Sequence, residues 1–174
     1  MLRRPPWPAD PSWQTVPDIT AAAAAVRAWP AGAGGADVVG GADGAGGAGE
    51  TVFLTTGRRD LGAFAADDRH RFLVRAVDPP DPEGPAPPRM TLLLARGPYT
   101  PAAEAALMRA HRVGLLVTKN SGGPMTAAKL QAARELGVRV VVVERPPLPP
   151  GSASAATVAE AVTWVRSAAG NAGA

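Results

Sequence analysis

Short apolar runs alternate with stretches of helical periodicity along the chain from Glu50 onward. The apolar runs are 51–56, 71–77, 90–96, 113–118 and 138–144, and the helical stretches are 58–66, 101–111, 125–136 and 156–168. Strands that are apolar almost throughout are typical of parallel sheets buried on both faces. The pattern predicts a Rossmann-like, doubly wound α/β domain over 51–168, with a mainly parallel sheet of about five strands and helices on both faces.

The segments outside this pattern are polar, proline-rich or of low complexity. Residues 1–29 are expected to form a linker segment with one helix, capped by Asp18. Residues 30–50 are rich in Gly and Ala and predict a flexible loop, and 169–174 predict a disordered tail. The proline-rich stretch 78–88 is expected to replace the crossover helix between two strands.

Composition narrows the possible chemistry. The 174 residues include no cysteine and two histidines, so disulfides, thiolate catalysis and histidine-rich metal sites are excluded, and no metal is expected. The formal net charge of +3 suits a small polyanionic ligand and does not argue for nucleic acid. No apolar run approaches a membrane span and the start lacks the apolar centre of a signal peptide, so a cytoplasmic protein without membrane contact is expected.

Unusual residues follow four of the predicted strands, where ligands bind in open α/β sheets. These four segments are Thr55-Thr56-Gly57-Arg58, Arg96-Gly97-Pro98-Tyr99, Thr118-Lys119-Asn120-Ser121-Gly122-Gly123 and Glu144-Arg145-Pro146. In a parallel sheet all four lie at one edge. The third segment combines donors on nearly every residue with glycines that allow close approach of the backbone, so it is the strongest candidate for a ligand loop.

Structural explanations stay open for the other segments. Thr55–Arg58 fits a turn with a helix cap as well as it fits an anion site. Thr100 and Pro101 fit the start of a helix, but this does not explain Arg96, a charge at the end of a buried strand. Glu144 and Arg145 fit a solvated strand end. Lys129, within a turn of the third segment, is a further candidate to face the ligand. From these residues alone, the prediction stops at an anionic ligand, with a nucleotide among the candidates.

Three ordered motifs extend the prediction: "FLTTGRRDLGAF", "ARGPYTPAAEAALM" and "LLVTKNSGGPMTAAKLQAARELGVRVVVVERP". In this order they resemble the carboxy-terminal half of the precorrin-6A reductase and cobalt-precorrin-6A reductase family of cobalamin biosynthesis. The early "RRPPWPADPSWQTVPDITAAAAAV" looks like the segment that joins the halves of that family. The resemblance implies an oxidoreductase acting on a CH–CH bond, with NADPH as cofactor and precorrin-6A, or its cobalt form, as substrate and precorrin-6B as product.

The resemblance also implies roles for residues of the four segments. Lys119 would be catalytic, either as proton donor or as ligand of a substrate carboxylate. The remaining candidates would bind substrate or cofactor: Thr55, Thr56, Gly57, Arg58, Arg96, Gly97, Pro98, Thr118, Asn120, Ser121, Gly122, Gly123, Lys129 and Arg145.

The resemblance covers the second domain and the joining segment only, which leaves three explanations open. A separate chain supplies the first domain, the start codon is misplaced, or the chain is a degraded copy. Two hypotheses therefore stand beside the enzyme. One is a non-catalytic module that holds an anionic tetrapyrrole or a nucleotide, and the other is a remnant without a ligand.

Overall fold

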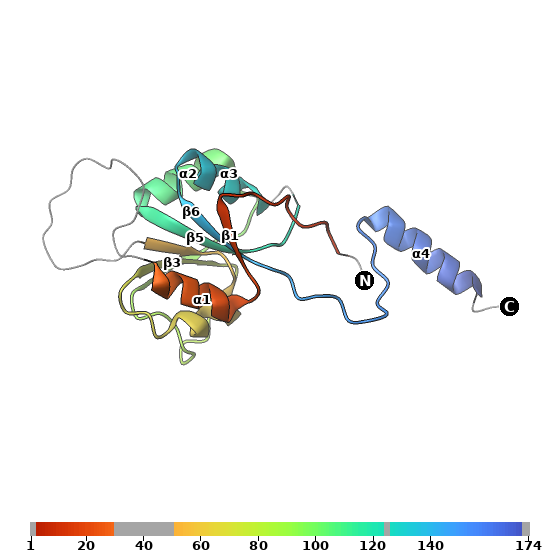
Figure 1. Ribbon diagram of the computed structural model, residues 1–174, viewed down its shortest axis with the longest axis horizontal. Coiled ribbons are helices and arrows are strands. Elements are labelled where there is room, and N and C mark those ends of the chain that lie inside the picture. Colours follow the sequence, from red (N-terminus) through yellow and green to blue (C-terminus); the bar gives the residue numbers. More distant parts are fainter. Residues whose placement is uncertain (1–2, 30–50, 124–125, 172–174) are drawn as a thin grey trace, which may run out of the picture.

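A six-stranded, fully parallel sheet forms the centre of the protein in the computed structural model, which describes residues 3–29, 51–123 and 126–171 (Figure 1). The strand order is β1-β6-β5-β2-β3-β4, and every neighbouring pair is parallel. The strands are β1 (Trp13–Val16), β2 (Thr51–Leu54), β3 (Arg71–Ala76), β4 (Met90–Leu94), β5 (Val113–Lys119) and β6 (Arg139–Val143). The predicted doubly wound α/β fold is confirmed.

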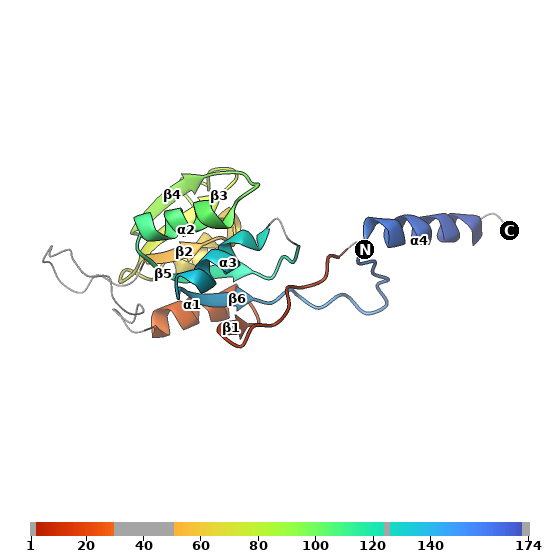
Figure 2. The same cartoon turned by 90° about the horizontal axis from the view of Figure 1, so that it is seen from above.

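Helices cover both faces of the sheet (Figure 1). One face packs against α1 (Ile19–Ala28) and the 3₁₀ helix η1 (Arg58–Phe64), and the other against α2 (Pro101–Ala110) and α3 (Ala128–Glu135). The last helix, α4 (Val158–Asn171), lies apart from the sheet in both views (Figure 2). Residues alternate between the two faces along each strand, so that Val52 and Leu54 enter one apolar core and Phe53 enters the other.

The segment predicted as a linker contributes a strand and a helix to this domain. Trp13–Val16 pairs in parallel with Val140–Val143 of β6, which gives six strands rather than about five. The predicted cap is confirmed, because Asp18 Oδ1 accepts a hydrogen bond of 2.8 Å from the N–H of Ala21. The predicted flexible loop, 30–50, lies outside the described residues, as do 172–174 of the predicted tail.

The predicted helices are present with changed boundaries or geometry. The first is a short 3₁₀ helix, and the helix predicted from 125 begins at Ala128 in the described residues. Thr100 caps α2, as predicted, and no helix lies between β3 and β4. The last helix runs on to Asn171, into the predicted tail. The apolar periodicity of this helix predicts a core position for Trp164, yet Trp164 is exposed.

His70 is another position that the local sequence misrepresents. Its charged neighbours indicate a solvated turn, yet its side chain is buried and its Nδ1 lies 2.8 Å from Asp67 Oδ2. Its ring also meets Phe72 edge-on. The pair is buried because the turn before β3 folds back onto the core that η1 covers.

A buried ion pair joins β3 to α2. The Arg75 guanidinium donates to both carboxylate oxygens of Glu104, at 2.5 and 3.1 Å. Its planar group also lies 3.8 Å from the ring centroid of Tyr99 and 5.0 Å from that of Phe53. Bidentate pairing and contact with aromatic faces are arrangements that suit arginine better than lysine. The pair therefore fixes how α2 sits on the strand that carries Arg75.

Removing one partner of this ion pair should be strongly destabilising. Glu104→Ala leaves the Arg75 charge buried without its counter-charge, and we expect a loss of about 3–5 kcal/mol in the free energy of unfolding. Glu135→Ala is the control, because Glu135 is exposed and accepts only from Gln131; its effect should stay within about 0.5 kcal/mol. Urea denaturation measures both. Equal effects of the two substitutions would contradict the assigned role of the pair.

Candidate functional site

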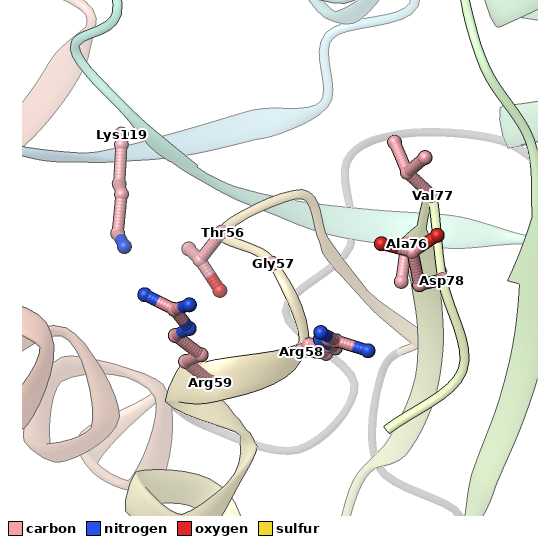
Figure 3. A pocket seen from close by; sticks show the side chains of 8 residues that line it. All are labelled: Thr56, Gly57, Arg58, Arg59, Ala76, Val77, Asp78 and Lys119. Atoms are coloured by element: carbon pink, nitrogen blue, oxygen red, sulfur yellow. The ribbon is translucent and has the colours of Figure 1, made fainter. Parts of the chain in front are cut away.

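A hollow of about 270 Å³, here called the Lys119 hollow, opens at the carboxyl ends of β2, β3 and β5 (Figure 3). This is the edge at which doubly wound sheets bind their ligands. The hollow is lined by Thr56, Gly57, Arg58, Arg59, Ala76, Val77, Asp78 and Lys119.

Three cationic side chains give the Lys119 hollow its charge. Lys119 and Arg59 point toward one another from β5 and η1, and Arg58 lies on the side of Asp78 (Figure 3). Lys119 Nζ is 2.7 Å from Asp60 Oδ2, and the Lys119 side chain remains 48% exposed. Arg58 donates to the carbonyl oxygen of Pro79 at 2.9 Å. The arrangement holds more positive than negative charge, so it can accept an anionic group.

Thr56 adds a buried hydroxyl to this hollow. The residue is only 8% exposed, and its Oγ1 has no hydrogen-bond partner among the described residues. Its neighbour Thr55, by contrast, donates across the sheet to the carbonyl oxygen of Val117 at 3.2 Å. Buried hydroxyls are nearly always paired, so the free Oγ1 indicates a group that a ligand would satisfy.

Gly57 lets the chain turn sharply between Thr56 and the two arginines. Its φ of 100° lies in a region that side-chain-bearing residues rarely adopt. Thr56, Arg58 and Arg59 lie close together in the sequence, and the turn lets all three line the same hollow.

A second hollow, here called the Trp7 groove, has a volume of about 760 Å³ and lies on the other side of the loop after β5. Three arginines line it, Arg3, Arg4 and Arg145, together with Trp7 and Trp13. Its remaining lining residues are Pro5, Pro6, Pro8, Ala9, Thr15, Asn120, Val142, Glu144, Ser154 and Ala156. Cations beside aromatic rings suit a flat anionic ligand.

Residues 3–9, here called the strap, cross the loop that contains Asn120 and Gly123. The backbone N–H of Trp7 donates to Asn120 Oδ1 at 3.0 Å, and its indole Nε1–H donates to the carbonyl oxygen of Gly123 at 3.1 Å. Arg145 Nη1 donates to the carbonyl oxygen of Arg4 at 2.7 Å. The strap therefore holds the loop in place and leaves only the amide N–H₂ of Asn120 to a ligand.

The structure divides the predicted site residues between these two hollows. Thr56, Gly57, Arg58 and Lys119 meet in the Lys119 hollow, and Asn120 and Arg145 line the Trp7 groove. Lys119 and Asn120 are consecutive yet face different hollows, because successive residues of an extended chain point to opposite faces. One loop thus contributes to both.

Several other candidates have structural partners instead. Thr118 is buried in β5, and Ser121 Oγ lies 3.2 Å from Thr126 Oγ1. Arg96, Gly97 and Pro98 follow β4, at the far end of the sheet, and line neither hollow. The peptide bond between Gly97 and Pro98 is cis, and the turn presents the Tyr99 ring to Arg75.

Lys129, predicted to face the ligand, lines neither hollow and is 7% exposed. Its Nζ donates to the carbonyl oxygen of Thr126 at 2.9 Å and lies 5.2 Å from the Trp7 ring centroid. Burial lowers the pKa of Lys129 to about 8, and the nearby charge of Arg75 contributes in the same direction. Lys129 therefore supports the loop from beneath.

Sequence reasoning missed Arg59, Asp78 and the strap. Asp78 directly follows the predicted strand 71–77, and ligands bind beyond the carboxyl ends of such strands, so this position could have been predicted. Arg59 directly follows Arg58, which was among the predicted site residues. Trp7 and the arginines beside it gave no local signal, because their contacts are with residues more than a hundred positions away.

The described residues hold no group of three or more His, Cys, Asp or Glu side chains placed to bind a metal ion. Among the helices that the structure describes, none is long and apolar enough to cross a membrane.

Fold and site together define a doubly wound α/β protein with a cationic ligand hollow at the carboxyl ends of its strands. The chain matches the family described as "Precorrin-6x reductase CbiJ/CobK" over residues 1–166. It belongs to this family, and the resemblance seen in the three sequence motifs is confirmed.

Named relatives agree with this assignment. The chain is 51% identical over 132 residues to the precorrin-6A reductase of Rhodococcus erythropolis, covering 76% of this chain and 52% of the relative. It is 45% identical over 166 residues to the precorrin-6A reductase of Mycobacterium tuberculosis strain H37Rv, and the match covers 95% of this chain and 59% of that relative. A solved structure named CobK precorrin-6A reductase is similar with a TM-score of 0.75 at 34% identity, and the match covers 95% of this chain and 60% of that structure's chain. The chain thus spans little more than half the length of these relatives.

Contact between the strap and the loop should make Gly122 irreplaceable. A Cβ at Gly122 would lie 2.0 Å from the carbonyl oxygen of Pro5, and its φ is +64°. Gly137 is the matched control, because its φ is +65° and a Cβ there meets nothing within 4 Å. We expect Gly137→Ala to cost about 1 kcal/mol of stability from φ alone, and Gly122→Ala to cost at least about 1 kcal/mol more.

The same pair of variants should differ in the position of the strap. The NMR signal of the Trp7 indole N–H, bonded to Gly123 in the wild type, should shift in Gly122→Ala and stay in place in Gly137→Ala. Equal stability losses with an unchanged Trp7 signal would show that the strap does not contact the loop in solution.

Burial of Lys129 should appear as a pH-dependent stability. With a pKa of about 8 when folded and 10.5 as its ordinary value, Lys129 binds fewer protons in the folded state between these pH values. The cost of its buried charge is therefore present below about pH 8 and disappears as the pH rises toward 10.5. Relative to Lys129→Arg, which stays charged, the wild type should gain up to about 3 kcal/mol over this range. Denaturation curves at several pH values measure the difference, and a constant difference would contradict it.

Proposed function

We propose that the chain acts in the NADPH-dependent reduction of precorrin-6A to precorrin-6B in cobalamin biosynthesis, and that the Lys119 hollow binds anionic groups for this reaction. The observation that carries the proposal is the set of three cations around the free hydroxyl of Thr56. The family and the names of the relatives support the reaction. A cytoplasmic location remains a prediction.

The charges of the Lys119 hollow fit the acidic groups of the proposed ligands. Precorrin-6A carries acetate and propionate carboxylates, and NADPH carries phosphates. Arg59 and Lys119 would pair with a carboxylate of precorrin-6A, and Thr56 Oγ1 would donate the hydrogen bond that it lacks. Because Lys119 already pairs with Asp60, an incoming carboxylate would exchange with that partner rather than meet a free cation.

The reaction adds a hydride and a proton across one ring double bond, and NADPH supplies the hydride. Lys119 holds a proton on Nζ at the edge of the hollow, and Asp60 fixes the position of that ammonium group. Lys119 would deliver this proton, or stabilise the charge that forms on the ring as the hydride arrives. Asn120 and Arg145 would hold the ligand on the other side of the loop, in the Trp7 groove.

A second candidate is a module that binds the anionic tetrapyrrole without reducing it. It is favoured by the Trp7 groove, where Arg3, Arg4 and Arg145 lie beside two tryptophans. Tight binding of precorrin-6A without turnover, even when the rest of the family protein is supplied, would support this alternative.

Lys119→Ala tests the proposed reaction. The experiment uses the chain joined to the portion of the Mycobacterium tuberculosis relative that it does not match. We expect turnover of precorrin-6A to fall at least about 100-fold, because the proton donor is lost, while the affinity for NADPH changes less than about threefold. Arg109→Ala, an exposed change at the end of α2, is the control and should leave both values unchanged. Unchanged turnover in Lys119→Ala would remove this residue from the mechanism.

A further inference from the structure

Helix α4 carries an exposed apolar face. Val158, Val162 and Val165 follow one another at helical spacing and are 67%, 42% and 58% exposed. Trp164 lies beside them and is 55% exposed. Glu160, Thr163, Arg166 and Ser167 occupy the opposite side of the helix, as their spacing requires. An amphipathic helix normally buries such an apolar face.

The start of α4 is well defined, so the exposed face is not that of a frayed end. Thr157 Oγ1 accepts from the N–H of Glu160 at 3.2 Å, and Glu160 Oε2 accepts from the N–H of Ala156 at 2.9 Å. This arrangement resembles a capping box, except that Glu160 accepts from the residue before the N-cap, and it stabilises the first turn of the helix. The sequence therefore specifies a helix here before any partner is considered.

Among the described residues, other helices already cover both faces of the sheet. One face of the sheet is covered by α1 and η1 and the other by α2 and α3. In both views α4 projects away from the sheet (Figure 2). The segment that leads to it is tied to the strap, where the N–H of Arg3 donates to the carbonyl oxygen of Ala155 and Arg3 Nη2 donates to that of Pro146, both at 2.8 Å.

Family membership indicates what covers this face. The family match runs to residue 166 and so includes all four apolar side chains of α4. The Mycobacterium tuberculosis relative matches 95% of this chain, yet the match covers only 59% of that relative. The helix thus lies within the matched part of the family protein, and its apolar face stays exposed in the described residues.

We propose that α4 docks its apolar face, formed by Val158, Val162, Trp164 and Val165, on the portion of the family protein that this chain does not match. The partner surface is apolar and lies on a folded domain. This inference rests on family membership and not on the proposed reaction, since docking does not require binding of any ligand.

Hydrogen exchange of the α4 amides tests the docking. The unmatched portion of the Mycobacterium tuberculosis relative is joined to this chain in the order found in that relative. We expect α4 to exchange at least about 100-fold more slowly in the joined protein than in the 174-residue chain alone. Val162→Lys should abolish this protection. The adjacent Thr163→Lys, on the polar side, should preserve it.

Other results would overturn the proposal. Equal exchange in the joined and isolated chains, or equal effects of the two lysine substitutions, would show that the face does not dock on this partner. Protection in the isolated chain that increases with concentration would instead assign the face to a second copy, and protection at all concentrations would place α4 on its own domain. Should the joined protein fail to fold, the matching helix of the full-length relative is measured in the same way, and fast exchange there overturns the proposal.

Discussion

Strand β5 pairs in parallel with β2 on one side and with β6 on the other, and both hollows depend on this pairing. It places Lys119 beside the residues that follow β2, and Asn120 beside those that follow β6. Because side chains alternate along the strand, one residue faces η1 and the next faces the strap. A shift of one residue in the register of β5 would exchange the two and dismantle both hollows.

The sequence predicts those features that depend on local pattern. The five predicted strands are nearly continuous in apolar residues, which indicates burial on both faces and hence parallel pairing. Parallel pairing places the predicted loops at one edge. Strand β1 was not predicted because only Val16 of its four residues is buried, and the strand is ordered by pairing with β6. The burial of Lys129 could not be predicted either, since distance along a helix does not reveal which side the helix buries.

The charges beneath the loop show a further limit of sequence reasoning. Arg75 lies on a strand and Glu104 on a helix, 29 residues later, and only the packing of α2 on the sheet brings them together. Lys129 adds a second buried cation close to this pair. These three buried charged residues thus come from three elements, β3, α2 and α3, and no spacing rule connects them. Trp164 presents the opposite case, a residue whose apolar periodicity is clear but which is exposed in the part of the chain that the structure describes.

The strap owes part of its order to the stiffness of its own chain. Pro5, Pro6 and Pro8 lie within its seven residues, and each fixes one backbone angle before the segment meets the loop. The unfolded segment therefore has fewer conformations to lose, and less entropy opposes its attachment. Its contacts with the loop and with Arg145 use the backbone of Arg4 and Trp7 as well as one indole group. Replacing these prolines would loosen the loop while leaving these hydrogen-bonding groups in place, because the change raises the conformational freedom of the unfolded chain.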